Sequence, residues 1–218
     1  GARFEMDVTP ELSLAVKADS SRQDEGLEAS SEEVNVGYRA AEQWTVSAGI
    51  RRDDRQDDSP VVSVTQKTGE RTDAVVQAEY DSKGNWTSYG FVQDTLSTSG
   101  EREDNGRIGV GGSLRVGERL VIDGEASAGD LGPGGRLGSS YVASEQTTLY
   151  VNYALENERT DNAFRGRYGN LVAGARSRLS DSASVYLEER YQRSDRASGL
   201  THATGMTVTA GERWNVGF

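Results

Sequence analysis

The chain has 218 residues, of which 34% are hydrophobic, and carries a formal net charge of −11. An acidic chain without a basic stripe argues against nucleic-acid binding, and the lack of cysteine excludes disulfides and thiolate chemistry. A transmembrane helix is excluded because no run of about 18 apolar residues occurs.

Apolar and polar residues alternate along most of the chain. The apolar residues share one parity in each of the runs 12–18, 44–50, 108–116 and 171–179. Successive side chains of a β-strand point to opposite faces, so each run predicts a strand with one apolar and one polar face. Seven short turn motifs precede such runs, at residues 9–11, 41–43, 82–85, 117–119, 144–146, 180–182 and 211–213.

The clearest hairpin is predicted over residues 137–155. Leu149, Val151 and Tyr153 share one parity, and the short polar turn 144–146 separates this run from the alternating run before it. The rest of the chain repeats this pattern, which predicts an all-β, antiparallel up-and-down sheet. A propeller or solenoid is less favoured because the apolar face is a single stripe, with no blade signature.

Longer polar connections are predicted at 20–32, 52–72, 97–106, 130–135, 157–169 and 194–199, and they carry most of the negative charge. The sheet would then have short turns on one rim and long polar loops on the other. Asp53, Asp54, Asp57 and Asp58 could offer oxygen ligands to a divalent cation, although a solvated rim is the simpler interpretation. The connection 52–72, which contains Val61, Val62 and Val64, could fold inward as a constriction.

The polar parity carries charges of both signs. Lys or Arg facing lipid near the bilayer midplane would cost about 2–4 kcal/mol each, so we expect these side chains to face a lumen. Cross-strand pairing is expected between Arg115 and Asp123 or Glu125, and between Arg178 and Glu188. The simpler interpretation is a hydrated wall of ion pairs, and the alternative is a transverse field that orients solutes. The charges predicted to line the lumen are Lys17, Arg39, Arg51, Glu79, Asp81, Arg107, Arg115, Asp123, Glu125, Arg176, Arg178, Glu188 and Arg190.

Trp44, Trp86 and Trp214 each follow a short turn. Tryptophan favours the membrane interface, so we predict an interface girdle in preference to a carbohydrate-stacking site. His202 is the only histidine, and we interpret it as an incidental residue near the rim. No catalytic residues, cofactor or metal site are predicted, and we expect no enzyme activity.

These features resemble Gram-negative outer-membrane β-barrel proteins over nearly the whole chain. The resemblance rests on the alternating hairpins, the turn-adjacent tryptophans and the segment Trp214–Phe218, which looks like the signal for barrel insertion. It implies one transmembrane barrel domain over residues 1–218, located in the outer membrane. The implied partners are the lipid bilayer, lipopolysaccharide, the barrel-insertion machinery and a periplasmic or surface partner domain.

Two functions follow from this resemblance. The first is a porin-like passive diffusion channel for small hydrophilic solutes, and the second is a structural barrel that anchors or secretes a larger partner domain. No plug region of a TonB-dependent transporter is visible. Fourteen strands are favoured over twelve; the alternative treats residues 3–19 and 201–218 as single strands. Fourteen strands place Gly1 and Phe218 on the long-loop rim, as expected of a segment of a larger barrel or a barrel opened at an outer loop.

Overall fold

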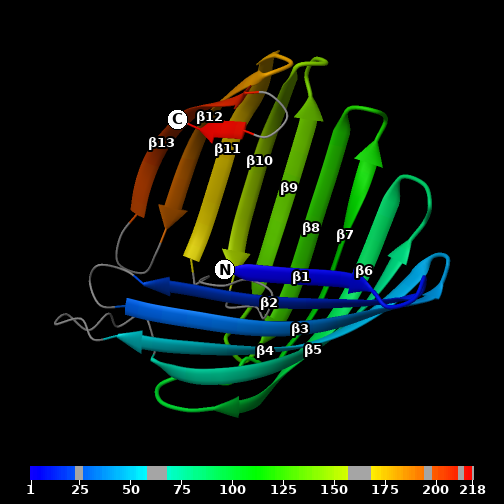
Figure 1. Cartoon of the computed structure of the whole chain (residues 1–218), viewed down its shortest axis with the longest axis vertical. Coiled ribbons are helices and arrows are strands. Elements are labelled where there is room, and N and C mark those ends of the chain that lie inside the picture. The colour runs from blue at the N-terminus through cyan, green and yellow to red at the C-terminus, as the bar shows by residue number, and fades with distance from the viewer. Residues whose placement is uncertain (23–26, 58–67, 157–167, 194–197, 211–213, 218) are drawn as a thin grey trace. The chain divides into compact units, whose positions relative to one another are not determined.

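The computed structural model describes residues 1–22, 27–57, 68–156, 168–193, 198–210 and 214–217. Its regular structure consists of fourteen strands in one antiparallel sheet, in which each strand lies beside its neighbours in sequence (Figure 1). The strands are β1 Ala2–Asp7, β2 Leu12–Arg22, β3 Leu27–Ala41, β4 Trp44–Asp57, β5 Gly69–Asp81, β6 Trp86–Thr98, β7 Arg107–Val116, β8 Leu120–Gly129, β9 Gly134–Val142, β10 Thr147–Glu156, β11 Tyr168–Ser180, β12 Ala183–Arg193, β13 Ser198–Ala210 and β14 Trp214–Gly217. The all-β, up-and-down prediction is confirmed, and so is the count of fourteen.

The twelve-strand alternative is wrong because the chain reverses between β1 and β2. Asp7 lies opposite Ser13 in an antiparallel ladder. Pro10 has no N–H to donate to a ladder, and the Thr9 hydroxyl accepts hydrogen bonds from the backbone N–H groups of Glu11 and Leu12. A single strand over residues 3–19 is therefore broken at this turn. At the other end of the chain, β13 pairs with β14 in the same antiparallel manner.

Several strands run further than the alternation predicts. The β2–β3 ladder continues to Arg22 opposite Glu28, and the β4–β5 ladder to Arg55 opposite Gly69. The loops predicted at 20–32 and 52–72 are therefore wrong in extent. Both faces of these strand ends are polar, so alternation gives no signal there. The proposed constriction with Val61, Val62 and Val64 lies outside the described residues.

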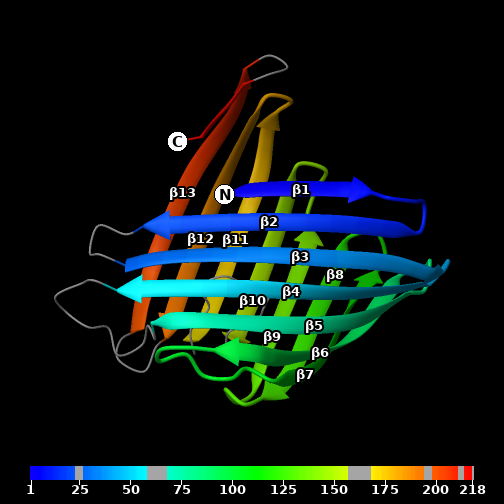
Figure 2. The ribbon, with the colours of Figure 1, turned by 60° about the horizontal axis from the view of Figure 1, so that its bottom comes forward.

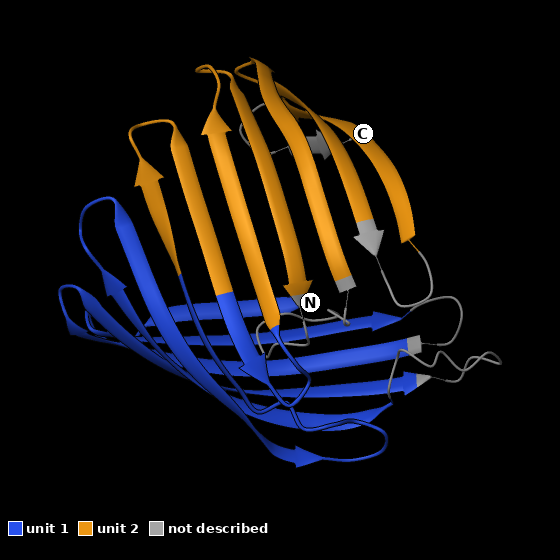
Figure 3. Ribbon diagram, turned by 180° about the vertical axis from the view of Figure 1, so that it is seen from behind, with its two compact units in different colours: residues 1–111, 126–133, 157–166 blue, residues 112–125, 134–156, 167–218 orange. Residues whose placement is uncertain are grey.

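The strands form two compact units (Figure 3). Unit 1 comprises Gly1–Gly111, Ala126–Pro133 and Asn157–Gly166, and unit 2 comprises Gly112–Glu125, Gly134–Glu156 and Arg167–Phe218. Strands β7 and β8 contribute residues to both units. Within unit 1, β1–β6 lie side by side in a curved layer (Figure 2). No helix in the described part of the chain is long and apolar enough to cross a membrane.

Each unit has its apolar side chains exposed and its polar side chains on the opposite face. Ala29 and Phe91 are the only buried hydrophobic residues among those described, whereas Val34, Val46 and Val76 of unit 1 are all exposed. Leu149, Val151 and Leu187 are exposed in unit 2. We call these two sides the apolar face and the polar face.

Candidate functional site: the polar face

Charges on the polar face of unit 1 alternate in sign across neighbouring strands. Lys17, Glu33, Arg51 and Asp73 lie directly opposite one another on β2, β3, β4 and β5. Directly opposed residues of a sheet point to the same face, so these four form one row. The next row toward the longer connections contains Asp19, Ser31, Asp53 and Arg71. The sheet register therefore brings opposite charges together.

Ion pairs link these two rows. Two nitrogens of the Arg51 guanidinium donate to Asp53 Oδ1, at 2.9 and 2.7 Å, and Glu33 lies 3.9 Å from Arg51. Arg71 Nε donates to Asp73 Oδ2 at 2.7 Å. The exposed fraction of the side chain is 2% for both arginines and 0% for Asp73. Burying such charges is costly unless each is paired and hydrogen-bonded, and this network meets that requirement.

The connection between β6 and β7 covers part of this network. Thr95 Oγ1 donates to Asp73 Oδ1 at 2.6 Å and accepts from the backbone N–H of Asn105 at 2.8 Å. Gln93 Nε2 donates to the carbonyl oxygen of Asn105 at 2.9 Å. Asn105 and Arg102 are both buried. The predicted long loop 97–106 therefore packs against the polar face instead of extending into solvent.

Arg107 fixes the neighbouring edge of unit 1. It is buried, and its guanidinium donates to the Ser127 hydroxyl at 2.8 Å and to the carbonyl oxygen of Gly132 at 3.2 Å. The backbone N–H of Gly106 donates to Asp130 Oδ2 at 2.8 Å. These bonds hold the start of β7 against the β8–β9 connection.

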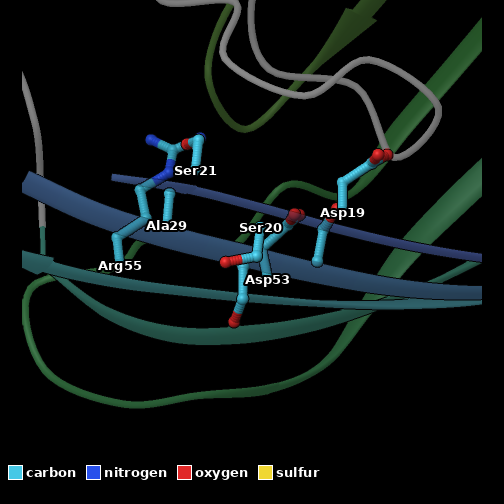
Figure 4. Close-up of a pocket in the computed structure, with 8 residues that line it drawn as sticks. Asp19, Ser20, Ser21, Ala29, Asp53 and Arg55 are labelled. Carbon is cyan, nitrogen blue, oxygen red and sulfur yellow. The ribbon is translucent and has the colours of Figure 1, made fainter. Parts of the chain in front are cut away.

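Two recesses open on the polar face of unit 1. One of about 350 Å³ is lined mainly by uncharged polar side chains, among them Ser13, Asn35, Ser47, Gln77 and Gln93. The other, of about 220 Å³, lies near the far ends of β2, β3 and β4. Figure 4 shows Asp19 and Arg55 on opposite sides of this second recess, with Asp53 between them. Hydroxyl, amide and charged groups of this kind can hydrogen-bond water or a hydrophilic solute.

In unit 2, a tyrosine crosses the polar face to reach a carboxylate. The Tyr150 hydroxyl on β10 donates to Glu188 Oε2 on β12 at 2.7 Å, although β11 lies between them. Gly174 of β11 makes this possible, because a Cβ there would lie 2.6 Å from the tyrosine ring. Glu188 also forms an ion pair with Arg190. Glu188 lies opposite Gly174, and Arg178 lies opposite Ser184. The predicted cross-strand pair of Arg178 with Glu188 is therefore wrong.

The register places the other predicted charges as follows. Arg39 and Glu79 share a row with Thr45 between them, and Asp81 ends β5 in contact with Lys83. Asp123 lies against Gly138 on the polar face of unit 2. The expected pairing of Arg115 with Asp123 or Glu125 stays a prediction, as does the lumen-lining role of the whole set.

Sequence reasoning missed several members of the network. Arg71 falls in the connection predicted at 52–72, and the sequence suggests Asp53 only as a possible cation ligand there. Glu33, Asp73 and Tyr150 are absent from the set predicted to line the lumen. The available signal was parity: Arg71 and Asp73 continue the odd-numbered series of Gln77 and Glu79.

An aromatic cluster lies on the apolar face at the short-turn end of unit 1. The Tyr80 ring lies 5.1 Å from the rings of Trp44 and Trp86, measured between centroids. The Ser82 hydroxyl donates to the carbonyl oxygen of Trp86 at 2.6 Å and so fixes the start of β6. Sequence reasoning missed Tyr80, which shares the parity of Trp86. The side chain of Trp214 lies outside the described residues, so its part in a girdle stays a prediction.

His202 lies on the apolar face of unit 2. It is opposite Glu189, and its Nδ1 lies 2.6 Å from Glu189 Oε1. Leu187, Tyr191 and Leu200 are exposed on the same face around this pair. The histidine is thus on the opposite side of the sheet from the ionic network.

The acidic run at the end of β4 does not form a ligand cluster within the described residues. Asp53 and Asp54 are consecutive strand residues that point to opposite faces, and Asp53 pairs with Arg51. The side chains of Asp57 and Asp58 lie outside the described residues. In the described part of the chain, no group of three or more His, Asp or Glu side chains is placed to hold a metal ion.

No protein-family model matches the chain, and no curated protein matches it. Among solved structures, it is similar to the crystal structure of an outer membrane channel from Pseudomonas putida F1. The TM-score is 0.43 and the identity 13%, over 90% of this chain and 83% of that chain.

Proposed function

We propose that the chain forms a transmembrane β-barrel, or a large part of one, in the outer membrane of a Gram-negative bacterium. Its apolar face contacts lipid, and its polar face lines a pore for small hydrophilic solutes. The lipid bilayer, lipopolysaccharide and the barrel-insertion machinery are the partners that this proposal implies. It includes no enzyme activity.

The observation that carries the proposal is that the sheet exposes its apolar side chains and buries charged ones, the opposite of a soluble protein. Soluble monomers rarely expose contiguous apolar patches larger than a few hundred Å², yet large apolar side chains are exposed on nearly every strand. Paired arginines and aspartates are buried on the opposite face. A lipid-facing exterior and a polar interior account for both features, as in outer-membrane barrels.

The length of the apolar face along a strand supports a membrane span. On β11 the residues of this face run from Leu171 to Leu179, which is nine residues of one strand. A transmembrane β-strand needs about 9–11 residues, because it crosses the bilayer at a tilt. The cluster of Trp44, Tyr80 and Trp86 fits the interface at one edge of that span.

A structural barrel that anchors or secretes a partner domain is the second candidate. The observation that favours it is the covering of the polar face of unit 1 by the β6–β7 connection, in which buried Asn105 is hydrogen-bonded to Gln93 and Thr95. Side chains that fill a lumen would leave no path for solutes. Conductance separates the two functions, because only the pore requires an open path across the membrane.

The experiment is single-channel recording from purified protein in planar bilayers, using the variants Gln77→Cys and Val76→Cys. Gln77 lines the 350 Å³ recess, whereas its neighbour Val76 is exposed on the apolar face. The chain has no cysteine, so a charged methanethiosulfonate reagent modifies one site only. We expect it to reduce the current through Gln77→Cys and leave that of Val76→Cys unchanged. No conductance from correctly folded protein would contradict the pore and leave the anchor.

A further inference from the structure

Two arginines lie together on the polar face of unit 2, near the turn between β11 and β12. Arg178 lies opposite Ser184 of β12, which in turn lies opposite Thr207 of β13. Arg176 lies one row further along β11, opposite Thr148 of β10. Both guanidinium groups therefore point to the same face, two residues apart, and both side chains are exposed.

These arginines differ from four other arginines of the polar face. Arg51, Arg71 and Arg190 each pair with a carboxylate, and Arg107 donates to a hydroxyl and a carbonyl. Within the described residues, neither guanidinium of Arg176 and Arg178 forms a hydrogen bond or an ion pair. Glu188, the nearest carboxylate along the same face of β12, is engaged by Tyr150 and Arg190.

The two guanidinium groups line a recess of about 500 Å³. Hydroxyl groups surround it from four strands and the turn; they belong to Thr148, Ser180, Ser182, Ser184, Thr207 and Thr209. Asp181 of the turn is the single carboxylate in its wall, so the two arginines leave a net positive charge. Guanidinium groups bind oxyanions through paired N–H donors, and hydroxyl groups can add further donors.

We propose that this recess is a binding site for small oxyanions, the carboxylate or phosphate group of a hydrophilic solute. The inference deepens the proposed pore, because it assigns a solute class to one part of its wall. The site lies at the short-turn end of the strands, which is the periplasmic end in outer-membrane barrels. It would hold an anionic solute at that mouth.

Binding is tested on folded, detergent-solubilised protein by calorimetric titration with inorganic phosphate. The test variant is the double substitution Arg176→Gln with Arg178→Gln. Arg190→Gln is the control for the loss of a cation from this face: it removes one positive charge, against two in the double variant, and takes it from a guanidinium that is already paired. We expect wild-type protein and the control to bind phosphate, and the double variant to bind it about tenfold more weakly or not at all. An absence of phosphate binding in the wild type, or equal binding in the double variant, would overturn the site.

Ion selectivity in planar bilayers keeps this inference separate from the pore itself. Under a KCl gradient, the reversal potential of the double variant should shift toward cation selectivity, while that of Arg190→Gln should shift less. Arginine-dependent phosphate binding without conductance would uphold the site and contradict the pore. Conductance without arginine-dependent phosphate binding would uphold the pore and contradict the site.

Discussion

Asp73 has no exposed surface, and its carboxylate accepts hydrogen bonds from Arg71 and Thr95. Asp73→Asn removes the negative charge that pairs with the buried Arg71 guanidinium. Breaking one side of a buried ion pair typically costs about 3–5 kcal/mol, because the remaining charge stays out of water. We expect a loss of that size in the free energy of unfolding. Urea titrations in detergent micelles, followed by tryptophan fluorescence, measure it.

Glu70→Gln is the matched control on the same strand. Glu70 pairs with Arg52 at 2.7 Å, but the two side chains are 46% and 54% exposed. Solvent screens an exposed pair, so we expect little change in stability. Equal effects of the two substitutions would show that the Asp73 network is not buried in the folded protein.

Gly174 is required by the side chain that crosses it. A Cβ at this position would lie 2.6 Å from the Tyr150 ring and 2.7 Å from the backbone oxygen of Leu187. Because a backbone atom is involved, Gly174→Ala should force the sheet to adjust, at a cost of about 1–3 kcal/mol. Gly199→Ala is the control, since nothing lies within 4 Å of its added methyl group. The same unfolding assay tests the pair, and a neutral Gly174→Ala would contradict the crossing of Tyr150.

The alternation of apolar and polar residues predicts the strands correctly where one face of the strand is apolar. It assigns Val46 and Leu149 to the same faces that the register and exposure show. Parity fails at the far ends of β3 and β4, where both faces carry polar residues and only backbone hydrogen bonds continue the strand. The predicted turn at 144–146 is confirmed, because the backbone N–H of Ala143 donates to the carbonyl oxygen of Thr147 at 2.9 Å.

The partners of the charged residues were harder to predict than their faces. Hairpin register decides which residues are opposed, and a bulge between Arg178 and Ser180 shifts it near that turn. Side chains also reach beyond their own row, as Tyr150 does across Gly174. Sequence alone contains neither the register across several strands nor the space that a glycine leaves for a neighbour.

Strand β12 allows the two faces to be compared at adjacent residues. Glu188 lies on the polar face with Tyr150 and Arg190, and Glu189 lies on the apolar face with His202. If the apolar face contacts lipid, the double substitution Glu189→Leu with His202→Leu should raise stability in bilayers, because it removes a polar pair from lipid. Glu188→Leu should lower stability, because it removes the carboxylate that accepts hydrogen bonds from Tyr150 and Arg190. Refolding into lipid vesicles over a urea series measures both effects; destabilisation by the leucine pair would place Glu189 in water.

At the scale of the molecule, charge is distributed differently on the polar faces of the two units. In unit 1, charges of two neighbouring rows are joined in buried ion pairs. In unit 2, Arg176 and Arg178 line an open recess, whereas Arg190 on the same face is paired with Glu188. The net charge of −11 therefore does not describe the surface that a solute would meet. Ion pairing within each polar face decides which charged side chains remain available to bind a solute.

The apolar face of the sheet should meet lipid and the polar face should meet water, and this difference decides whether the chain spans a membrane. It is tested most directly by spin labels on single cysteines at Val46 and Ser47, which are adjacent on β4 and lie on opposite faces. Ile122 and Asp123 provide the equivalent pair on β8. In protein reconstituted into bilayers, labels at Val46 and Ile122 should collide with lipid-soluble oxygen and be shielded from a water-soluble nickel chelate. Labels at Ser47 and Asp123 should show the reverse preference. Oxygen accessibility that is equal at both members of each pair, or higher at Ser47 and Asp123, would contradict a lipid-facing apolar face.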